Sequence, residues 1–184
     1  MRMLLKWSLG LAVLIGLIIG GLLLAGQRAS AGHQQGDIVI AATPAQVFPW
    51  IVEYDKRSRW IAGLERMEWM NGDAITLGAV RTEWVTIEGD TTEMHVMFKR
   101  LEPPTRVELF VTAVDNLTNP AAFKFEVLWE LEAIDGGTRV RCTRDGEYLS
   151  QPARLLEPLI SAMENDQLAA NLEALKTVVE AAAD

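Results

Sequence analysis

The clearest alternation of hydrophobic and polar positions runs from Phe123 to Glu132. Every second residue from Phe123 to Leu131 is apolar, and most residues between them are charged. Side chains of a strand point alternately to its two faces, so this pattern predicts a strand with one buried face and one solvated face.

The dipeptide Asp135-Gly136 ends this strand and predicts a two-residue hairpin turn, which favours glycine because it requires positive φ angles. The turn sets apolar residues opposite each other on the buried face and opposite charges opposite each other on the solvated face. The predicted pairs are Leu131 with Val140, Trp129 with Cys142, Glu132 with Arg139, and Glu130 with Arg141. A four-residue loop that includes Gly137 is the alternative.

Other segments show similar patterns and are separated by Gly, Pro or Asn, which end strands. Such short spacings predict an antiparallel meander. The predicted strands are 37–42, 65–70, 79–86, 91–101, 106–114, 122–134 and 138–148.

Apolar residues at three- and four-residue steps predict a long amphipathic helix over 152–182, with Glu164 on its polar side. Pro158 should bend this helix or separate its first turn. The apolar stripe needs a large partner, and the face of the predicted sheet provides one. A short helix should start at Thr43-Pro44 and a second short helix or turn should cover 54–60.

Residues 1–31 differ from the rest of the chain. Trp7 to Gly26 carries no charge and follows a short basic start, which is typical of an uncleaved signal anchor that crosses a membrane. The alternative is a signal peptide cleaved after Ala31. Both interpretations place the remainder outside the cytoplasm, with residues 32–36 as a linker and 37–184 as the folded domain.

Charge and composition restrict the chemistry. The chain of 184 residues has a formal net charge of −8, and the excess of acidic residues lies after residue 36, so we expect no nucleic-acid partner. The single cysteine, Cys142, excludes an internal disulfide and is predicted to be a core thiol. With two histidines and no phosphate-binding motif, we expect no metal and no cofactor. Nothing in the sequence specifies an oligomeric state.

The order of strand, two short helices, antiparallel strands and a long C-terminal helix resembles the START-related superfamily, also called SRPBCC. The segment from Ile38 to Asp55 is similar to the opening of that family, and Leu172 to Glu180 to its closing helix. The resemblance implies the α+β helix-grip fold, in which a curved antiparallel sheet wraps around the C-terminal helix and encloses an apolar cavity. Its members include lipid-transfer domains, polyketide cyclases and dehydrases, and coenzyme-Q-binding proteins.

Alternation along the predicted strands assigns the cavity lining. Thr82, Arg144 and Asn165 are the polar candidates for orienting a ligand. The predicted ligand-binding residues are Met67, Trp69, Thr82, Trp84, Met94, Val96, Phe98, Leu109, Val111, Phe123, Phe125, Val127, Trp129, Arg144 and Met163.

Together these features favour a membrane-tethered module that binds or transports an apolar small molecule or lipid. A cyclase or dehydratase is a second hypothesis, but the assigned lining contains no clear acid or base and no catalytic residue is assigned. An interaction or scaffold domain with a filled core is a third. A cavity below roughly 300 Å³ would count against both ligand hypotheses.

Overall fold

The structure is a computed structural model that describes residues 32–72, 74–87, 89–113, 123–149 and 151–183. The predicted signal anchor at 1–31 lies outside these residues. None of the helices in the described ranges is long and apolar enough to span a membrane.

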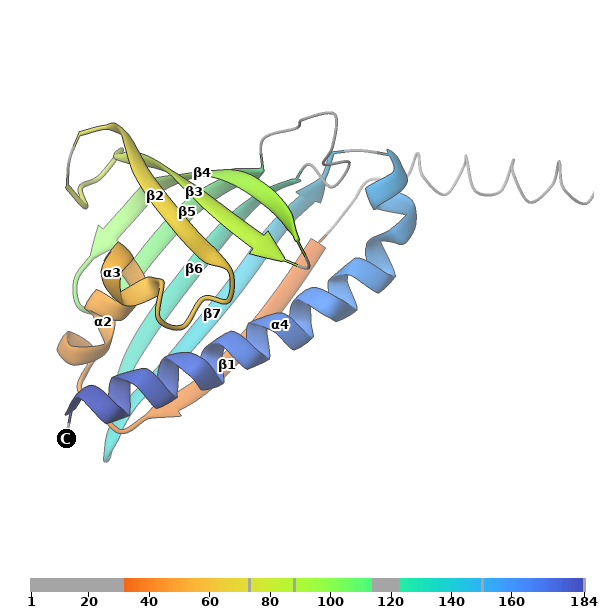
Figure 1. Cartoon of the computed structure of the whole chain (residues 1–184). Helices are drawn as coiled ribbons and strands as arrows, with labels where there is room; N and C mark the ends of the chain where they lie inside the picture. The colour runs from red at the N-terminus through yellow and green to blue at the C-terminus, as the bar shows by residue number, and fades with distance from the viewer. Residues whose placement is uncertain (1–31, 73, 88, 114–122, 150, 184) are drawn as a thin grey trace, which may run out of the picture.

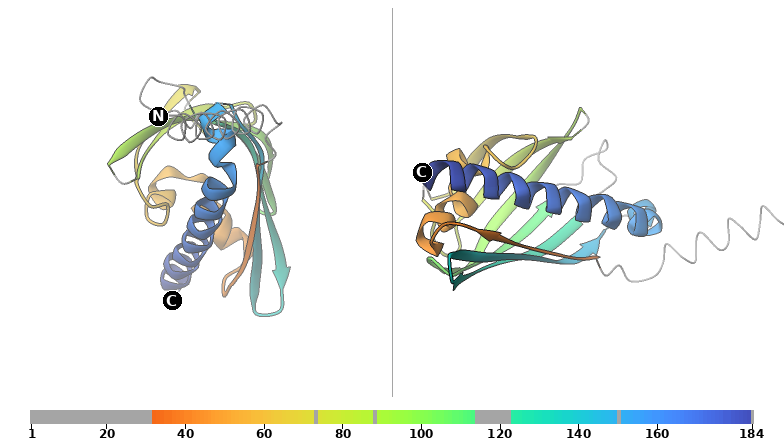
Figure 2. Two further views of the ribbon diagram at one scale, coloured as in Figure 1. Left: turned by 90° about the vertical axis from the view of Figure 1, so that its right-hand side faces the viewer. Right: turned by 90° about the horizontal axis from the view of Figure 1, so that it is seen from below.

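Seven strands form one antiparallel sheet in the order β1-β7-β6-β5-β4-β3-β2. Figure 1 shows this sheet curving around the long helix α4, and the two views of Figure 2 show the helix lying along the concave side. The predicted helix-grip architecture is therefore confirmed. The elements are β1 (Gly32–Ile40), α2 (Pro44–Val52), α3 (Tyr54–Arg57), β2 (Leu64–Asn71), β3 (Val80–Ile87), β4 (Asp90–Glu102), β5 (Arg106–Ala113), β6 (Phe123–Ile134), β7 (Gly137–Tyr148) and α4 (Gln151–Ala183).

The hairpin of β6 and β7 has the predicted register. Trp129 pairs with Cys142 and Leu131 with Val140, and the charged pairs on the other face also match. Gly136 has a φ angle of 80°, which a glycine reaches without steric cost. The two-residue turn is thus confirmed over the longer loop.

The first strand begins earlier than predicted. Residues 32–36, expected to be a linker, belong to β1, in which Gly32 pairs with Gly146 and Gly36 with Cys142 of β7. The polar residues of this stretch show no strand pattern. Its backbone is extended because it pairs with β7, more than a hundred residues away in the sequence.

Helix α2 starts as predicted, with Thr43 before Pro44 at the first helical position. The Gln46 side chain accepts a hydrogen bond from the Thr43 backbone N–H at 2.9 Å, which satisfies a donor that the helix leaves unpaired. The helix is nine residues long and contains Pro49.

Only part of the apolar stripe on α4 is covered. Leu168, Leu172 and Leu175 are buried, whereas Leu159 and Met163 remain 61% and 60% exposed. Pro158 lies inside the helix, and Figure 1 shows its first turns tilted away from the rest. The sheet therefore grips the C-terminal half of α4 and leaves apolar residues of the first half exposed.

Candidate functional site

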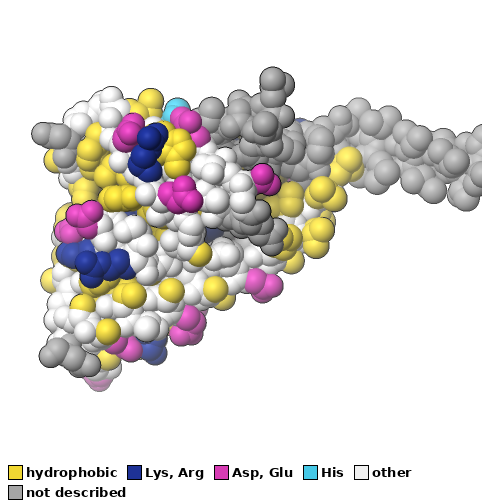
Figure 3. All heavy atoms as spheres, viewed as in Figure 1, with side chains coloured by type: hydrophobic (Ala, Val, Ile, Leu, Met, Phe, Trp, Pro, Cys, Tyr) yellow, Lys and Arg dark blue, Asp and Glu magenta, His cyan; other side chains and the backbone are white. Residues whose placement is uncertain are grey.

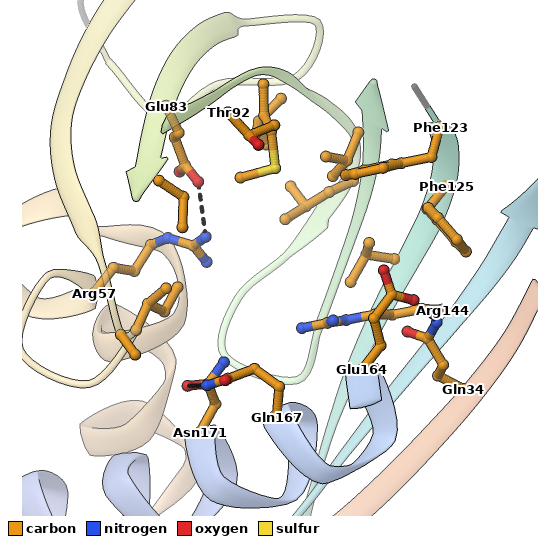
Figure 4. Close-up of a pocket in the computed structure, with 18 of the residues that line it drawn as sticks. Gln34, Arg57, Glu83, Thr92, Phe123, Phe125, Arg144, Glu164, Gln167 and Asn171 are labelled. Carbon is orange, nitrogen blue, oxygen red and sulfur yellow. Dashed lines mark hydrogen bonds and ion pairs between the residues drawn. The ribbon is translucent and has the colours of Figure 1, made fainter. Parts of the chain in front are cut away.

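A cavity of about 240 Å³ lies between the concave face of the sheet, the region of α3 and α4. Apolar residues of three adjacent strands make up its wall (Figure 4). These residues are Met94 and Val96 of β4, Leu109 and Val111 of β5, and Phe123, Phe125, Val127 and Trp129 of β6.

The wall follows from alternation on neighbouring strands in matched register. Val96 pairs with Val111, and Val111 pairs with Phe125, so these side chains share one face of the sheet. Trp129 is 3% exposed and its ring meets that of Trp60 edge-on, with centroids 5.9 Å apart. The Trp60 Nε1 donates a hydrogen bond to the Trp50 carbonyl oxygen at 2.8 Å, which fixes the ring at the cavity wall.

A buried ionic cluster lies on the side of α3. The Glu83 carboxylate contacts an Nη2 of Arg81 at 2.6 Å and of Arg57 at 3.1 Å. Arg57 also donates to the Ile51 carbonyl oxygen and Arg81 to the Val52 carbonyl oxygen, at 2.8 and 2.7 Å. Two guanidinium groups thus share one carboxylate, and both are tied to the last residues of α2.

Burial and charge act on this cluster in opposite directions. Burial would raise the pKa of Glu83, but the guanidinium groups of Arg57 and Arg81 outweigh it and hold that pKa below its usual value. Burial lowers the pKa of Arg81 to about 10, partly offset by Glu83. Two guanidinium groups against one carboxylate leave the cluster with one excess positive charge.

A second polar group lies on the side of α4. Glu164 Oε2 accepts hydrogen bonds from Gln34 Nε2 of β1 and, at 2.5 Å, from the Tyr148 hydroxyl of β7. Burial and this bond to the carboxylate raise the pKa of Tyr148. Gln34 is 1% exposed, so its amide is committed to Glu164 at the edge of the cavity.

Arg144 lines the cavity from β7, on the same face of the strand as Cys142. The neighbouring Cys142 is fully buried, and burial raises its pKa to about 11 despite the opposing effect of the nearby Arg144 charge. Cys142 is therefore a protonated core thiol. No group of metal-ligating side chains occurs among the described residues.

The predicted face of β3 is wrong. Thr82 and Trp84 pair with His95 and Glu93 on the outer face of the sheet, and Arg66 covers the Trp84 ring at 3.8 Å. The inner positions hold Arg81 and Glu83, which hydrophobicity assigned to the outside. These charges are stable inside because they pair with each other and with Arg57.

The remaining predicted residues divide into two groups. Met67 and Trp69 pair with Glu83 and Arg81 on the inner face, and Phe98 is buried beside Trp69, but the three do not line the cavity. Met163 is exposed and also does not line it, so its assignment is wrong. Asn165 is exposed as well.

Sequence reasoning missed most polar residues of the cavity. Glu164 was assigned to the solvated side of α4 and Glu83 to the solvated face of β3, and the others were not considered. The polar residues missed are Gln34, Arg57, Glu83, Thr92, Glu164, Gln167 and Asn171. The two charged residues of β3, Arg81 and Glu83, lie two positions apart and were the one available signal. Without knowledge of Arg57, which approaches from α3, this signal does not indicate a buried cluster.

Comparison with known proteins supports this architecture. The family model described as polyketide cyclase/dehydrase and lipid transport matches residues 33–180. A search of curated proteins found no match.

Solved structures with low sequence identity share the fold. A conserved protein from Geobacillus kaustophilus aligns with a TM-score of 0.68 at 15% identity, covering 80% of this chain and 94% of the other. An uncharacterised protein from Rhizobium leguminosarum aligns with a TM-score of 0.63 at 17% identity, covering 84% and 99%. At such identities the similarity establishes the fold alone.

Proposed function

The chain belongs to the polyketide cyclase/dehydrase and lipid transport family, and on that premise we propose that it binds an apolar small molecule or lipid between the sheet and α4. The observation that carries this proposal is the continuous apolar wall formed by β4, β5 and β6. Apolar surface gains about 25 cal/mol per Å² when it leaves water, so such a wall provides affinity for hydrocarbon.

The size of the cavity limits the ligand. Its volume of about 240 Å³ is below the roughly 300 Å³ at which pockets for drug-sized molecules begin. The volume therefore counts against both ligand hypotheses, and most strongly against a bulky ligand such as a polycyclic polyketide, so the proposal rests on the apolar wall and is restricted to a small molecule. It favours a small apolar molecule or one hydrocarbon chain of a lipid.

A cyclase or dehydratase acting on an apolar substrate is the second candidate, and Glu164 favours it. General acid–base catalysis requires a titratable group within hydrogen-bond reach of the substrate, and the Glu164 carboxylate lines the cavity. The exchange Glu164→Gln separates the two functions. A binding module retains its ligand unchanged in both proteins, whereas an enzyme converts the bound compound and loses this turnover in the variant.

We propose further that residues 1–31 tether the domain to a membrane, on its extracytoplasmic side. Two features support this. Residues 1–31 join the domain at Gly32, the first residue of β1, which pairs with Gly146 of β7. Helix α4 begins soon after Gly146, at Gln151, so the point where residues 1–31 join the domain lies near the start of α4. The exposed apolar residues Leu156, Leu159 and Met163 lie on the first turns of α4, where Figure 3 shows hydrophobic side chains gathered. Membrane fractionation with N-terminal sequencing tests the tether, and a mature protein that begins at Gly32 would contradict it.

Extraction of the purified full chain tests ligand binding. The protein is held in amphipol without detergent, its apolar contents are extracted, and mass spectrometry quantifies them. Val111→Phe fills the cavity, since Val111 lies on its wall. Val39→Phe is the matched control, because Val39 is an exposed residue of β1.

We expect a discrete apolar compound, measured per mole of protein, in near-equal amounts in the wild type and in Val39→Phe. Val111→Phe should carry at least fivefold less of it. Equal amounts in all three proteins would mean that the compound is bound elsewhere. No compound in any of them, with no gain in thermal stability from added lipids, would refute the proposal and favour a domain with a filled core.

A further inference from the structure

Two arginine side chains point into the apolar cavity from opposite sides. Figure 4 shows Arg57 reaching in from α3 and Arg144 from β7, with their guanidinium groups directed toward each other. Both residues line the cavity. Burying a cation in apolar surroundings costs free energy unless an anion or several hydrogen-bond acceptors pair with it. The acceptors around each guanidinium group therefore decide how well its charge is compensated.

Arg57 is only partly satisfied. Its side chain is 8% exposed and carries five N–H donors, of which one bonds to Ile51 and one to Glu83. Its buried Nε has no acceptor in the described part of the chain. Glu83 is also shared with Arg81, so the carboxylate does not balance both charges.

Arg144 has less support. Its charge acts on the nearby Cys142 thiol, but sulfur is a poor hydrogen-bond partner. No ion pair joins Arg144 to any carboxylate of the described residues, although Glu164 also lines the cavity. Glu164 Oε2 instead accepts the bonds from Gln34 and Tyr148.

We propose that the cavity binds a single-chain amphiphile whose carboxylate head lies between Arg57 and Arg144 and whose hydrocarbon chain lies along the apolar wall. This inference rests on the proposed function and narrows its ligand to an anion. A carboxylate has two acceptor oxygens that match the paired N–H groups of guanidinium. It supplies the missing negative charge for two cations. Arg57 shares the Glu83 carboxylate with Arg81, and Arg144 has no carboxylate partner among the described residues.

The dimensions and charges favour one short chain. A volume of about 240 Å³ does not accommodate a lipid with two acyl chains, whereas aromatic and branched side chains from Phe123 to Trp129 suit a narrow hydrocarbon. The acidic charge of the domain as a whole disfavours anions at long range, so selectivity has to come from these two groups at short range.

Isothermal titration calorimetry with the full chain in amphipol tests the proposal with three ligands of equal chain length: decanoate, 1-decanol and decyl phosphate. Arg144→Gln removes the charge without breaking an ion pair. Arg144→Lys keeps the charge. Arg141→Gln is the matched control, because Arg141 lies on the same strand and is exposed on the opposite face.

We expect the wild type and Arg141→Gln to bind decanoate at least tenfold tighter than 1-decanol. Arg144→Gln should lower the affinity for decanoate at least tenfold and change that for 1-decanol less than twofold, and Arg144→Lys should restore part of the preference. Circular dichroism melts of the same samples verify that the variants are folded.

The possible failures are distinct. Equal affinity of the wild type for decanoate and 1-decanol would overturn the carboxylate site and leave apolar binding intact. An equal loss of both ligands in Arg144→Gln would show that Arg144 acts through shape, which also overturns it. Tighter binding of decyl phosphate than of decanoate would overturn the assignment of the head group. Absence of binding by all three ligands would overturn this inference and the proposed function together.

Discussion

The exchange Glu83→Gln should strongly destabilise the domain. Glu83 is 2% exposed, and its carboxylate contacts guanidinium groups of Arg81 and Arg57 at 2.6 and 3.1 Å. Glutamine keeps the size of the side chain but removes the charge. Two buried cations, each anchored to a carbonyl oxygen at the end of α2, would then face each other without an anion.

The magnitude follows from the burial of all three groups. Breaking a buried ion pair by removing one partner costs about 3–5 kcal/mol, because the other partner stays buried and uncompensated. For a domain of this size, each kcal/mol shifts the melting temperature by about 2–4 °C. The melting temperature should therefore fall by about 6–20 °C. The loss of about 3–5 kcal/mol is a large part of a total free energy of unfolding of about 5–15 kcal/mol.

Glu126→Gln is the matched control. Glu126 lies in β6 and pairs with Lys99 at 2.5 Å, but its side chain is 55% exposed. Solvent screening limits such pairs to about 0–1 kcal/mol, so its melting temperature should change little. Thermal denaturation followed by circular dichroism measures both variants. A melting temperature for Glu83→Gln as close to wild type as that of Glu126→Gln would refute the buried cluster.

The same cluster predicts a pH dependence. The pKa of Glu83 lies below its usual value in the folded protein, so the folded state binds this proton less readily than the unfolded chain. Its stabilising contribution is fully present above the unfolded pKa and is lost as the pH falls through the folded pKa. The stability difference between wild type and Glu83→Gln should therefore shrink as the pH is lowered below about 4.5, and a difference that is constant there would contradict this cause.

Two further predictions concern packing. A Cβ at Gly146 would lie 2.1 Å from the Lys124 carbonyl oxygen, which is backbone, whereas one at Gly36 would meet side chains alone, Leu172 at 2.8 Å and Leu168 at 3.4 Å. Gly146→Ala should therefore cost about 1–3 kcal/mol in a denaturant melt and Gly36→Ala clearly less. The reverse order would contradict the register of β6 and β7. Because Cys142 is buried with a pKa of about 11, iodoacetamide at pH 8 should modify it only after unfolding, and rapid modification of the folded chain would show that the thiol is accessible.

Local patterns in the sequence determined most of the secondary structure. The Asp135-Gly136 turn and the alternation that follows Phe123 were sufficient to predict the register of β6 and β7. These features are decided by neighbours in the chain, because a turn type fixes which strand residues face each other. The apolar wall from Phe123 to Trp129 followed from the same alternation.

The interior of the site depended on partners far away in the chain. Hydrophobicity placed Trp84 inside and Glu83 outside, yet β3 turns Glu83 inward because Arg57 approaches it from α3. The helix pattern likewise implied a uniformly covered α4 and a solvated Glu164. The sheet covers only the helix's C-terminal half, and Gln34 and Tyr148 draw Glu164 into the cavity.

The sequence by itself thus determined the strands, the long helix and the apolar cavity wall, because alternation and turn chemistry are local properties. Only the tertiary structure decided which charged residues enter the cavity. A buried charge is stable only when its partner is in place, and the partners of Glu83, Arg57 and Glu164 come from separate elements that folding brings together.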